Sequence, residues 1–110
     1  MSDDQLARQV FDNLVMIKVG EGSRVLFWKD RWIHGFAIFD IAPLIYSSVD
    51  TRTRKRRTVQ EALDNNRWLQ DIHGNISFTV QLQLMHLGHA IGSVQRDAQM
   101  SDIFSWPCDN

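Results

Sequence analysis

Residues Val19 to Trp32 read VGEGSRVLFWKDRW, and this stretch decides which fold the chain adopts. Two glycines flank a glutamate, strand-like apolar runs lie on both sides of them, and two of the four tryptophans follow. A short glycine-containing connection between two such runs is typical of a β-hairpin. The pattern therefore predicts a hairpin over Val15 to Trp32, with Phe27 or Trp28 mostly buried.

The two glycines could instead cradle a phosphate, but the residues after them do not favour it. A Walker loop has Lys and then Ser or Thr after its last glycine, and it opens a helix. Here Gly22 is followed by Ser23 and Arg24, and then by an apolar, strand-like run. A turn is therefore favoured over a nucleotide site.

The aromatic residues of the same stretch have two interpretations. Phe27, Trp28 and Trp32 could stack on bases, while Arg24, Lys29 and Arg31 contact phosphates. Large rings also supply most of the burial that a small domain can achieve. Aromatic residues at this spacing are more often core, and we expect these to be core.

Helical signals dominate the rest of the chain. A capping-box pattern and apolar residues at helical spacing predict an N-terminal helix from Asp3 to about Asn13. Similar signals predict helices over residues 59–64 and 79–91, whereas residues 34–57 lack a sustained period and read as a long irregular connection. The expected fold is a small single α+β domain over residues 1–110: an N-terminal helix, a β-hairpin with an aromatic core and two further helices.

Composition limits the classes of protein to consider. The chain has 110 residues, of which 44% are hydrophobic and 23% charged, as in an ordinary globular domain. No apolar run is long enough to span a bilayer, and the acidic start MSDDQLARQ is unlike a secretory signal. The single cysteine, Cys108, suits a reducing compartment. We expect an intracellular protein of the nucleus or cytoplasm that is not secreted, with no membrane partner, cofactor or small-molecule substrate.

One run carries a strong local charge although the net charge is only −1. Five of the twelve basic residues lie in RTRKRR, at positions 52–57. Such a run can contact a nucleic-acid backbone or serve as a nuclear import signal, and it can equally be a solvated linker. We expect an exposed basic linker over residues 50–57, so that its cations could be replaced by serine without altering the fold. The candidate nucleic-acid-binding residues are Arg52, Arg54, Lys55, Arg56 and Arg57.

Metal-binding and catalytic patterns are weak. His86 and His89 lie one helical turn apart and Cys108 is a conceivable third ligand, but a structural zinc site usually has four ligands with a close cysteine pair. The segment GHAIGSV at residues 88–94 offers neither the turn nor the partners of a serine nucleophile. We therefore expect no metal ligand and no catalytic residue, and we expect that the protein is not an enzyme.

The pattern V-G-x-G-x-x-x-x-F-W-x-D-x-W resembles a segment in polyproteins of plant non-LTR (LINE-type) retrotransposons. In that family the segment lies downstream of the reverse-transcriptase domain, just before the reverse-transcriptase zinc-binding module. Two further segments resemble the family in the same order: KRRTVQEALDNNRWLQDI at residues 55–72 and DIFSW at residues 102–106. The resemblance implies a structural role for the motif residues Gly20, Gly22, Phe27, Trp28, Asp30 and Trp32.

The resemblance also implies what the chain lacks. The polymerase's metal-binding aspartate pair has no counterpart here, and the cysteine and histidine ligands of the zinc module would lie beyond Asn110. Residues 102–110 would be the truncated start of that module. The expected function is a catalytically inert connector fragment, and the alternative is a small, sequence-nonspecific nucleic-acid-binding protein that uses Arg52–Arg57. A metal-dependent nuclease or polymerase accessory enzyme is disfavoured because the ligand sets are missing.

Overall fold

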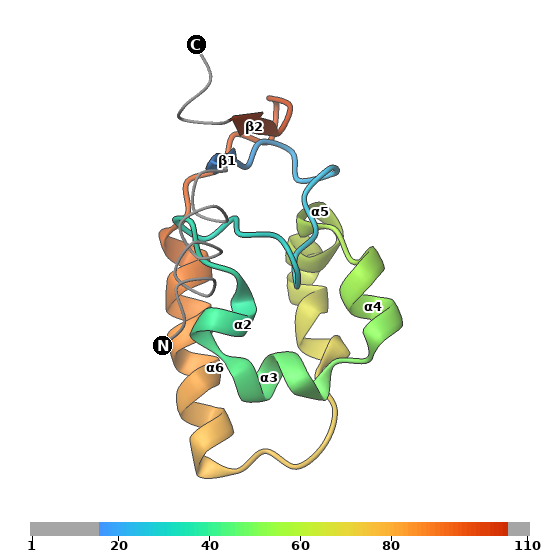
Figure 1. The fold of residues 1–110 in the computed structure, drawn as a ribbon, viewed down its shortest axis with the longest axis vertical. Helices are drawn as coiled ribbons and strands as arrows, with labels where there is room; N and C mark the ends of the chain where they lie inside the picture. The colour runs from blue at the N-terminus through green and yellow to red at the C-terminus, as the bar shows by residue number, and fades with distance from the viewer. Residues whose placement is uncertain (1–15, 106–110) are drawn as a thin grey trace, which may run out of the picture.

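The computed structural model describes residues 16–105, and Figure 1 shows one long helix beside several short elements. In chain order the elements are β1 (Met16–Lys18), α2 (Ile38–Ile41), α3 (Pro43–Ser48), α4 (Thr51–Arg56), α5 (Val59–Leu63), the 3₁₀ helix η1 (Asp64–Asp71), α6 (Phe78–Ser93) and β2 (Ile103–Ser105). The predicted N-terminal helix, the start of the predicted hairpin at Val15, and residues 106–110 lie outside the described part of the chain.

The strand pair joins two distant parts of the sequence. β1 pairs antiparallel with β2, and Ile17 lies opposite Phe104. The α+β class with an antiparallel strand pair is therefore confirmed, but the predicted partner strand was wrong. The run after the glycines instead makes backbone hydrogen bonds to the segment before α5. Phe27 N–H donates to the Arg57 carbonyl at 2.8 Å, and Val59 N–H donates to the Val25 carbonyl at 2.8 Å.

The core is built around an aromatic cluster of Phe27, Trp28, Trp32 and Trp68, all of them buried among aliphatic side chains. Phe27 lies at its centre, with its ring centroid 4.8 Å from that of Trp28, 5.5 Å from that of Trp32 and 5.7 Å from that of Trp68. The edge-to-face arrangement of Phe27 and Trp28 is a favourable geometry for aromatic rings. The predicted burial of Phe27 or Trp28 is confirmed for both residues.

Residues 34–57 are not an irregular connection, because the segment forms α2, α3 and α4. Pro43 occupies the start of α3, where a proline needs no hydrogen-bonded N–H. Asp50 caps α4 by accepting a hydrogen bond from Thr53 N–H at 2.7 Å. These helices are four to six residues long, so they are too short to produce an amphipathic period in the sequence.

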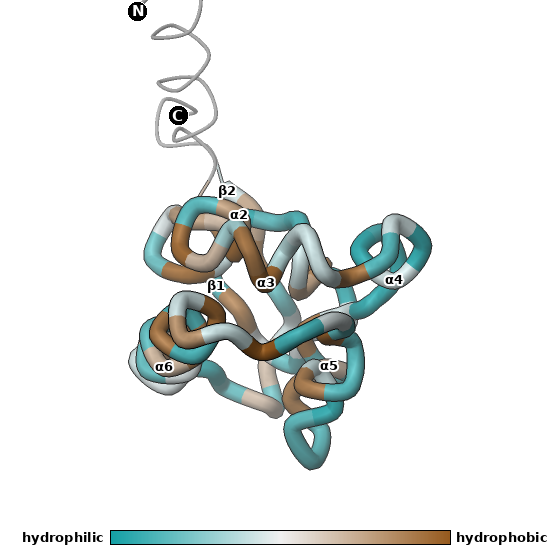
Figure 2. The backbone as a smooth tube through the Cα atoms, turned by 90° about the horizontal axis from the view of Figure 1, so that it is seen from below, coloured by the Kyte–Doolittle hydropathy of each residue, from teal (hydrophilic) through white to brown (hydrophobic). Residues whose placement is uncertain are grey.

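The two helices predicted from capping and periodicity are confirmed as α5 and α6. Thr58 and Glu61 form a reciprocal capping box at the start of α5, and Asn65 and Asn66, both with positive φ, kink the chain after it. α6 and α4 lie on opposite sides of the molecule, and Figure 2 shows α4 as predominantly hydrophilic. Among residues 16–105, no helix combines the length and apolar character that crossing a membrane would need.

Candidate functional site

The glycine loop surrounds an anion that belongs to the protein itself. The backbone N–H groups of Gly20 and Gly22 donate to Asp102 Oδ1 at 2.8 and 2.9 Å, and that of Arg24 donates to Asp102 Oδ2 at 2.8 Å. Glu21 N–H donates to the Met100 carbonyl at 2.7 Å. Converging backbone N–H groups form an anion-binding concavity. Here the concavity is filled by a buried carboxylate about 80 residues away in the sequence.

Both glycines are required by this close approach. A Cβ atom on Gly20 would lie 2.1 Å from the Met100 carbonyl oxygen. Gly22 has a φ of +86°, and a Cβ there would lie 2.7 Å from Gln60 N. The G-x-G spacing is thus explained by packing against residues 100–102 and against the start of α5, without a bound phosphate.

Asp30 and Trp32 close the turn that follows. Asp30 Oδ2 accepts a hydrogen bond from Leu26 N–H at 2.8 Å, and Asp30 N–H donates to the Leu26 carbonyl at 3.1 Å. Trp32 Nε1 donates to the Phe27 carbonyl at 2.8 Å inside the core. The polar groups of Asp30 and Trp32 are therefore used within the turn itself.

A second buried carboxylate, Asp71, links the aromatic cluster to the basic run. Asp71 Oδ2 accepts from Trp28 Nε1 at 3.0 Å and from Arg57 Nε at 2.9 Å, and Asp71 Oδ1 accepts from Arg57 Nη2 at 2.7 Å. The hydrogen bond with Asp71 raises the pKa of the Arg57 guanidinium, although partial burial acts against this. A bidentate pair of this kind has a fixed geometry, so it orients both Arg57 and the Trp28 ring.

The basic run divides into two groups of residues. Arg54 and Arg57 make intramolecular contacts: Arg54 lies 4.6 Å from the Tyr46 ring centroid and donates from Nε to the Val49 carbonyl at 2.9 Å. Arg57 pairs with Asp71 as described above. The expectation of an exposed linker was therefore wrong: the run forms α4, and two of its five cations help to hold the fold together.

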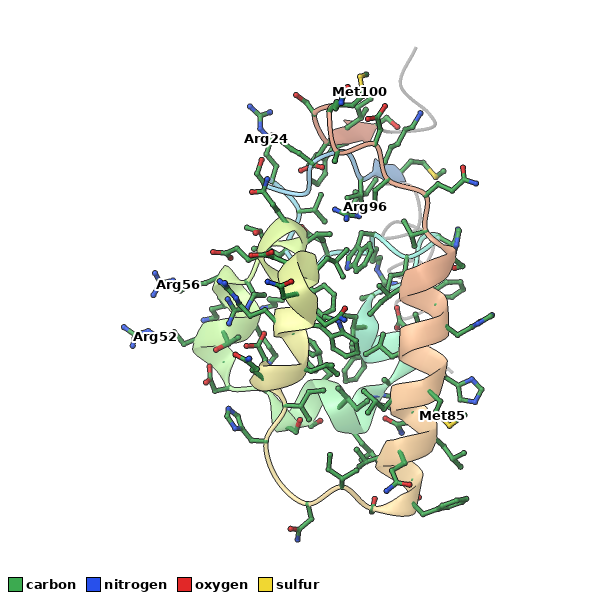
Figure 3. All side chains as sticks on the ribbon, turned by 180° about the vertical axis from the view of Figure 1, so that it is seen from behind. Arg24, Arg52, Arg56, Met85, Arg96 and Met100 are labelled. Atoms are coloured by element: carbon green, nitrogen blue, oxygen red, sulfur yellow. The ribbon has the colours of Figure 1, made fainter. Side chains whose placement is uncertain are left out.

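The other three cations, Arg52, Lys55 and Arg56, are exposed. Figure 3 shows Arg52 and Arg56 projecting away from the body of the molecule. None of the three forms an ion pair with another residue in the range 16–105. We call these three residues the basic surface. Of the three basic residues considered with these aromatic side chains, Arg24 and Lys29 are exposed, whereas Arg31 pairs with Asp40 at 2.8 Å.

A groove of about 920 Å³ lies between β1, residues 32–36 and the C-terminal end of α6. At its edge His34 Nε2 lies 3.0 Å from Ser93 Oγ. Ser93 Oγ also donates to the Ala90 carbonyl at 2.6 Å, so its proton is already used. An activated serine passes its proton to the histidine, and this pair lacks that arrangement. Ser93, in the segment GHAIGSV, thus has a histidine partner that sequence reasoning missed, because His34 lies 59 residues away.

Metal ligands do not gather in the described residues. His86 and His89 are both exposed on α6, and Cys108 lies outside the described range. Within residues 16–105 no group of three His, Cys, Asp or Glu side chains is placed to hold a metal ion.

Asp71 and Asp102 are the residues that sequence reasoning passed over. Both lie in segments that carry the family resemblance, yet neither belongs to a local pattern that marks it as an acceptor. In the sequence, the glycine loop was the feature that could have indicated a buried acceptor, because buried backbone N–H groups need a hydrogen-bond partner. That signal shows that an acceptor is needed, but it does not say where in the sequence the acceptor lies.

Neither protein-family models, nor curated proteins, nor solved structures produced a match.

Proposed function

We propose that this chain is a catalytically inert connector domain of the kind found downstream of reverse transcriptase in plant LINE-type retroelements, acting inside the cell. One observation supports the proposal most: the polar groups of the motif are used in internal hydrogen bonds. Asp30 closes its own turn, and Asp102 fills the glycine loop. Residues with these contacts hold a connector in shape, and they leave few polar groups for a substrate.

Carboxylate-to-amide substitution at Asp102 tests this proposal. In Asp102→Asn, an amide NH₂ group that points to Arg24 N–H would put two donors face to face. We expect the free energy of unfolding to fall by about 2–3 kcal/mol. Asp97→Asn is the matched control, because Asp97 also accepts a backbone hydrogen bond, from Gln99 at 3.0 Å, but on an exposed loop. The control should change stability by less than about 0.5 kcal/mol.

Whether Asp102→Asn lowers or raises the stability of the fold distinguishes a structural carboxylate from a functional one. Removing a charged group from an active site often raises stability, because such sites are maintained at a cost in stability. A rise in the unfolding midpoint of Asp102→Asn would therefore contradict the connector proposal. The origin is tested separately by sequencing the genomic flanks, where reverse-transcriptase codons upstream and zinc-module codons downstream are expected.

The second candidate function is sequence-nonspecific binding of a nucleic-acid backbone. The basic surface supports it, because three exposed cations on the six-residue helix α4 have no ion-pair partner in residues 16–105. Each phosphate neutralised releases counterions, so three contacts on duplex DNA give a slope of log affinity against log salt of about −3 at most. α4 contains no Asn or Gln, and only two of its arginines, Arg52 and Arg56, are exposed, so it offers few side chains for base readout in the major groove.

A salt titration with labelled duplex and single-stranded oligonucleotides tests this second function. The variant Arg52→Ser, Lys55→Ser, Arg56→Ser should lose binding while its circular dichroism stays unchanged. The control variant Lys18→Ser, Arg67→Ser, Arg96→Ser removes the same charge from three exposed positions elsewhere and should retain most of the affinity. Equal affinities of the two variants would contradict assignment to the basic surface. No binding by the wild type at low salt would leave the connector function alone.

A further inference from the structure

An exposed aromatic side chain is connected to the helix that carries the basic surface. Phe39, on α2, is 55% exposed. Its ring centroid lies 5.4 Å from that of Tyr46 on α3, in an edge-to-face arrangement. The Tyr46 ring centroid lies in turn 4.6 Å from the guanidinium carbon of Arg54 on α4. A continuous set of contacts therefore leads from an aromatic ring at the surface to α4.

The short connections between these helices keep the three side chains together. Only Ala42 separates α2 from α3, and only Val49 and Asp50 separate α3 from α4. Figures 1 and 2 both show α2, α3 and α4 following one another in this order across the molecule. The aromatic ring and the cations thus belong to one continuous stretch of surface, and they do not depend on a distant segment for their arrangement.

Arg54 is held in place and still has donors for a ligand. Its Nε donates to the Val49 carbonyl at 2.9 Å, and its Nη2 donates to Thr51 Oγ1 at 3.4 Å. A guanidinium has five N–H donors, so the other three have no hydrogen-bond partner within residues 16–105. Lys55 follows Arg54 by about 100° around α4. A row of phosphates that begins at Arg54 can therefore continue across α4 over Lys55 to Arg56.

The two carboxylates that adjoin these residues in sequence are already used inside the fold. Asp40, next to Phe39, accepts hydrogen bonds from Arg31 Nη1 at 2.8 Å and from Ala37 N–H at 3.0 Å. Asp50 caps α4 by accepting a hydrogen bond from Thr53 N–H at 2.7 Å. Both negative charges are partly compensated by these donors, so the cations of α4 dominate the charge of this surface.

An exposed ring beside cations suits an unpaired nucleotide better than a duplex. The bases of a duplex are stacked on one another, so their faces cannot reach Phe39. An unpaired base can stack on an aromatic ring while its phosphates bind nearby cations. Stacking tolerates any sequence, because every base has a π face. This agrees with the scarcity of base-reading side chains on α4.

We propose that the basic surface binds single-stranded nucleic acid, with a base stacked on Phe39 and the adjacent phosphates bound by Arg54 and the basic surface. The inference rests on the second candidate function above and names its class of ligand. About three to four phosphate contacts on a single strand give a slope of log affinity against log salt of about −2 to −3.

Substitution of the ring tests stacking separately from charge. The probes are labelled oligothymidylate, oligouridylate and a DNA duplex, each of about 12 nucleotides or base pairs, titrated with the full chain at low salt. The wild type should bind a single strand more tightly than the duplex, and the tighter single strand identifies DNA or RNA as the ligand. Phe39→Leu keeps an apolar side chain but removes the π face. It should weaken single-strand binding at least about fivefold and leave duplex binding unchanged, whereas Phe39→Tyr should retain both.

Phe36→Leu is the matched control, because Phe36 is also 55% exposed but lines the groove between β1 and α6. It should bind every probe like the wild type, and circular dichroism should show that each variant is folded. Unchanged single-strand affinity in Phe39→Leu, or an equal loss in Phe36→Leu, would overturn the stacking role. Equal binding of duplex and single strand, weakened by the triple serine variant of the basic surface, would overturn this inference and leave backbone binding standing. No binding of any probe would overturn both.

Discussion

Two carboxylates hold distant parts of this chain together, and a third closes a local turn. Asp102 binds the N–H groups of the glycine loop, Asp71 binds Arg57 and Trp28, and Asp30 closes a turn. Asp71 and Asp102 are only 6% and 7% exposed, yet each accepts three hydrogen bonds. A buried polar group is tolerated when its partners are in place and is costly when one of them is lost. Single substitutions among these partners should therefore have large effects.

We expect Arg57→Ser to lower the free energy of unfolding by about 2–3 kcal/mol, because it leaves Asp71 charged and without its ion-pair partner. Lys55→Ser is the matched control in the same run and should stay within about 0.5 kcal/mol of the wild type. Urea unfolding followed by tryptophan fluorescence measures both. Equal midpoints for the two variants would show that the Arg57–Asp71 contact contributes little to stability.

Helix caps explain which elements form. α5 has only five residues, and it begins where Thr58 accepts a hydrogen bond from Glu61 N–H while Glu61 Oε1 accepts one from Thr58 N–H. Isolated helices of this length are unstable in water, so capping and packing together decide whether α5 forms. Val59 and Ala62 supply the packing, since both are buried.

The capping box should make part of the stability depend on pH. The backbone hydrogen bond from Thr58 lowers the pKa of Glu61 in the folded state below its ordinary value of 4.5. Ionised Glu61 therefore stabilises the fold above that pH, and the contribution is lost as the pH falls through the folded-state pKa. Thermal melts of Glu61→Gln should show a shallower loss of stability between about pH 5 and about pH 3 than the wild type. Parallel curves would contradict this linkage.

At the scale of the whole molecule, one aromatic cluster joins segments that are far apart in sequence. Phe27, Trp28 and Trp32 come from the loop after the glycines, and Trp68 comes from η1. Truncating such a ring removes buried area, leaves a cavity and, at Trp28, also breaks the hydrogen bond to Asp71.

Trp28→Ala should therefore lower the free energy of unfolding by about 3–5 kcal/mol. Phe36→Ala is a suitable control, because Phe36 is an aromatic residue that is 55% exposed. It should cost less than about 1 kcal/mol. Denaturant unfolding followed by circular dichroism gives both values, and comparable midpoints would argue against a single cooperative core.

The sequence by itself determined the features that depend on neighbouring residues. The capping box at Thr58 and the apolar spacing after Phe78 were sufficient to predict α5 and α6. The size of the rings at Phe27 and Trp28 was sufficient to predict their burial. In each case the interacting groups lie within a few residues of one another, or the property belongs to one side chain.

Only the tertiary structure decided the features that depend on distant partners. The pairing of β1 with β2, the Asp102 carboxylate in the glycine loop and the Arg57–Asp71 pair join residues that are 14 to 89 positions apart. The glycine-containing turn suggested a local hairpin, but buried N–H groups bind whichever acceptor the fold brings to them. The same reason explains why a run that reads as a solvated linker contains two cations held by intramolecular contacts and three that form no ion pair within residues 16–105.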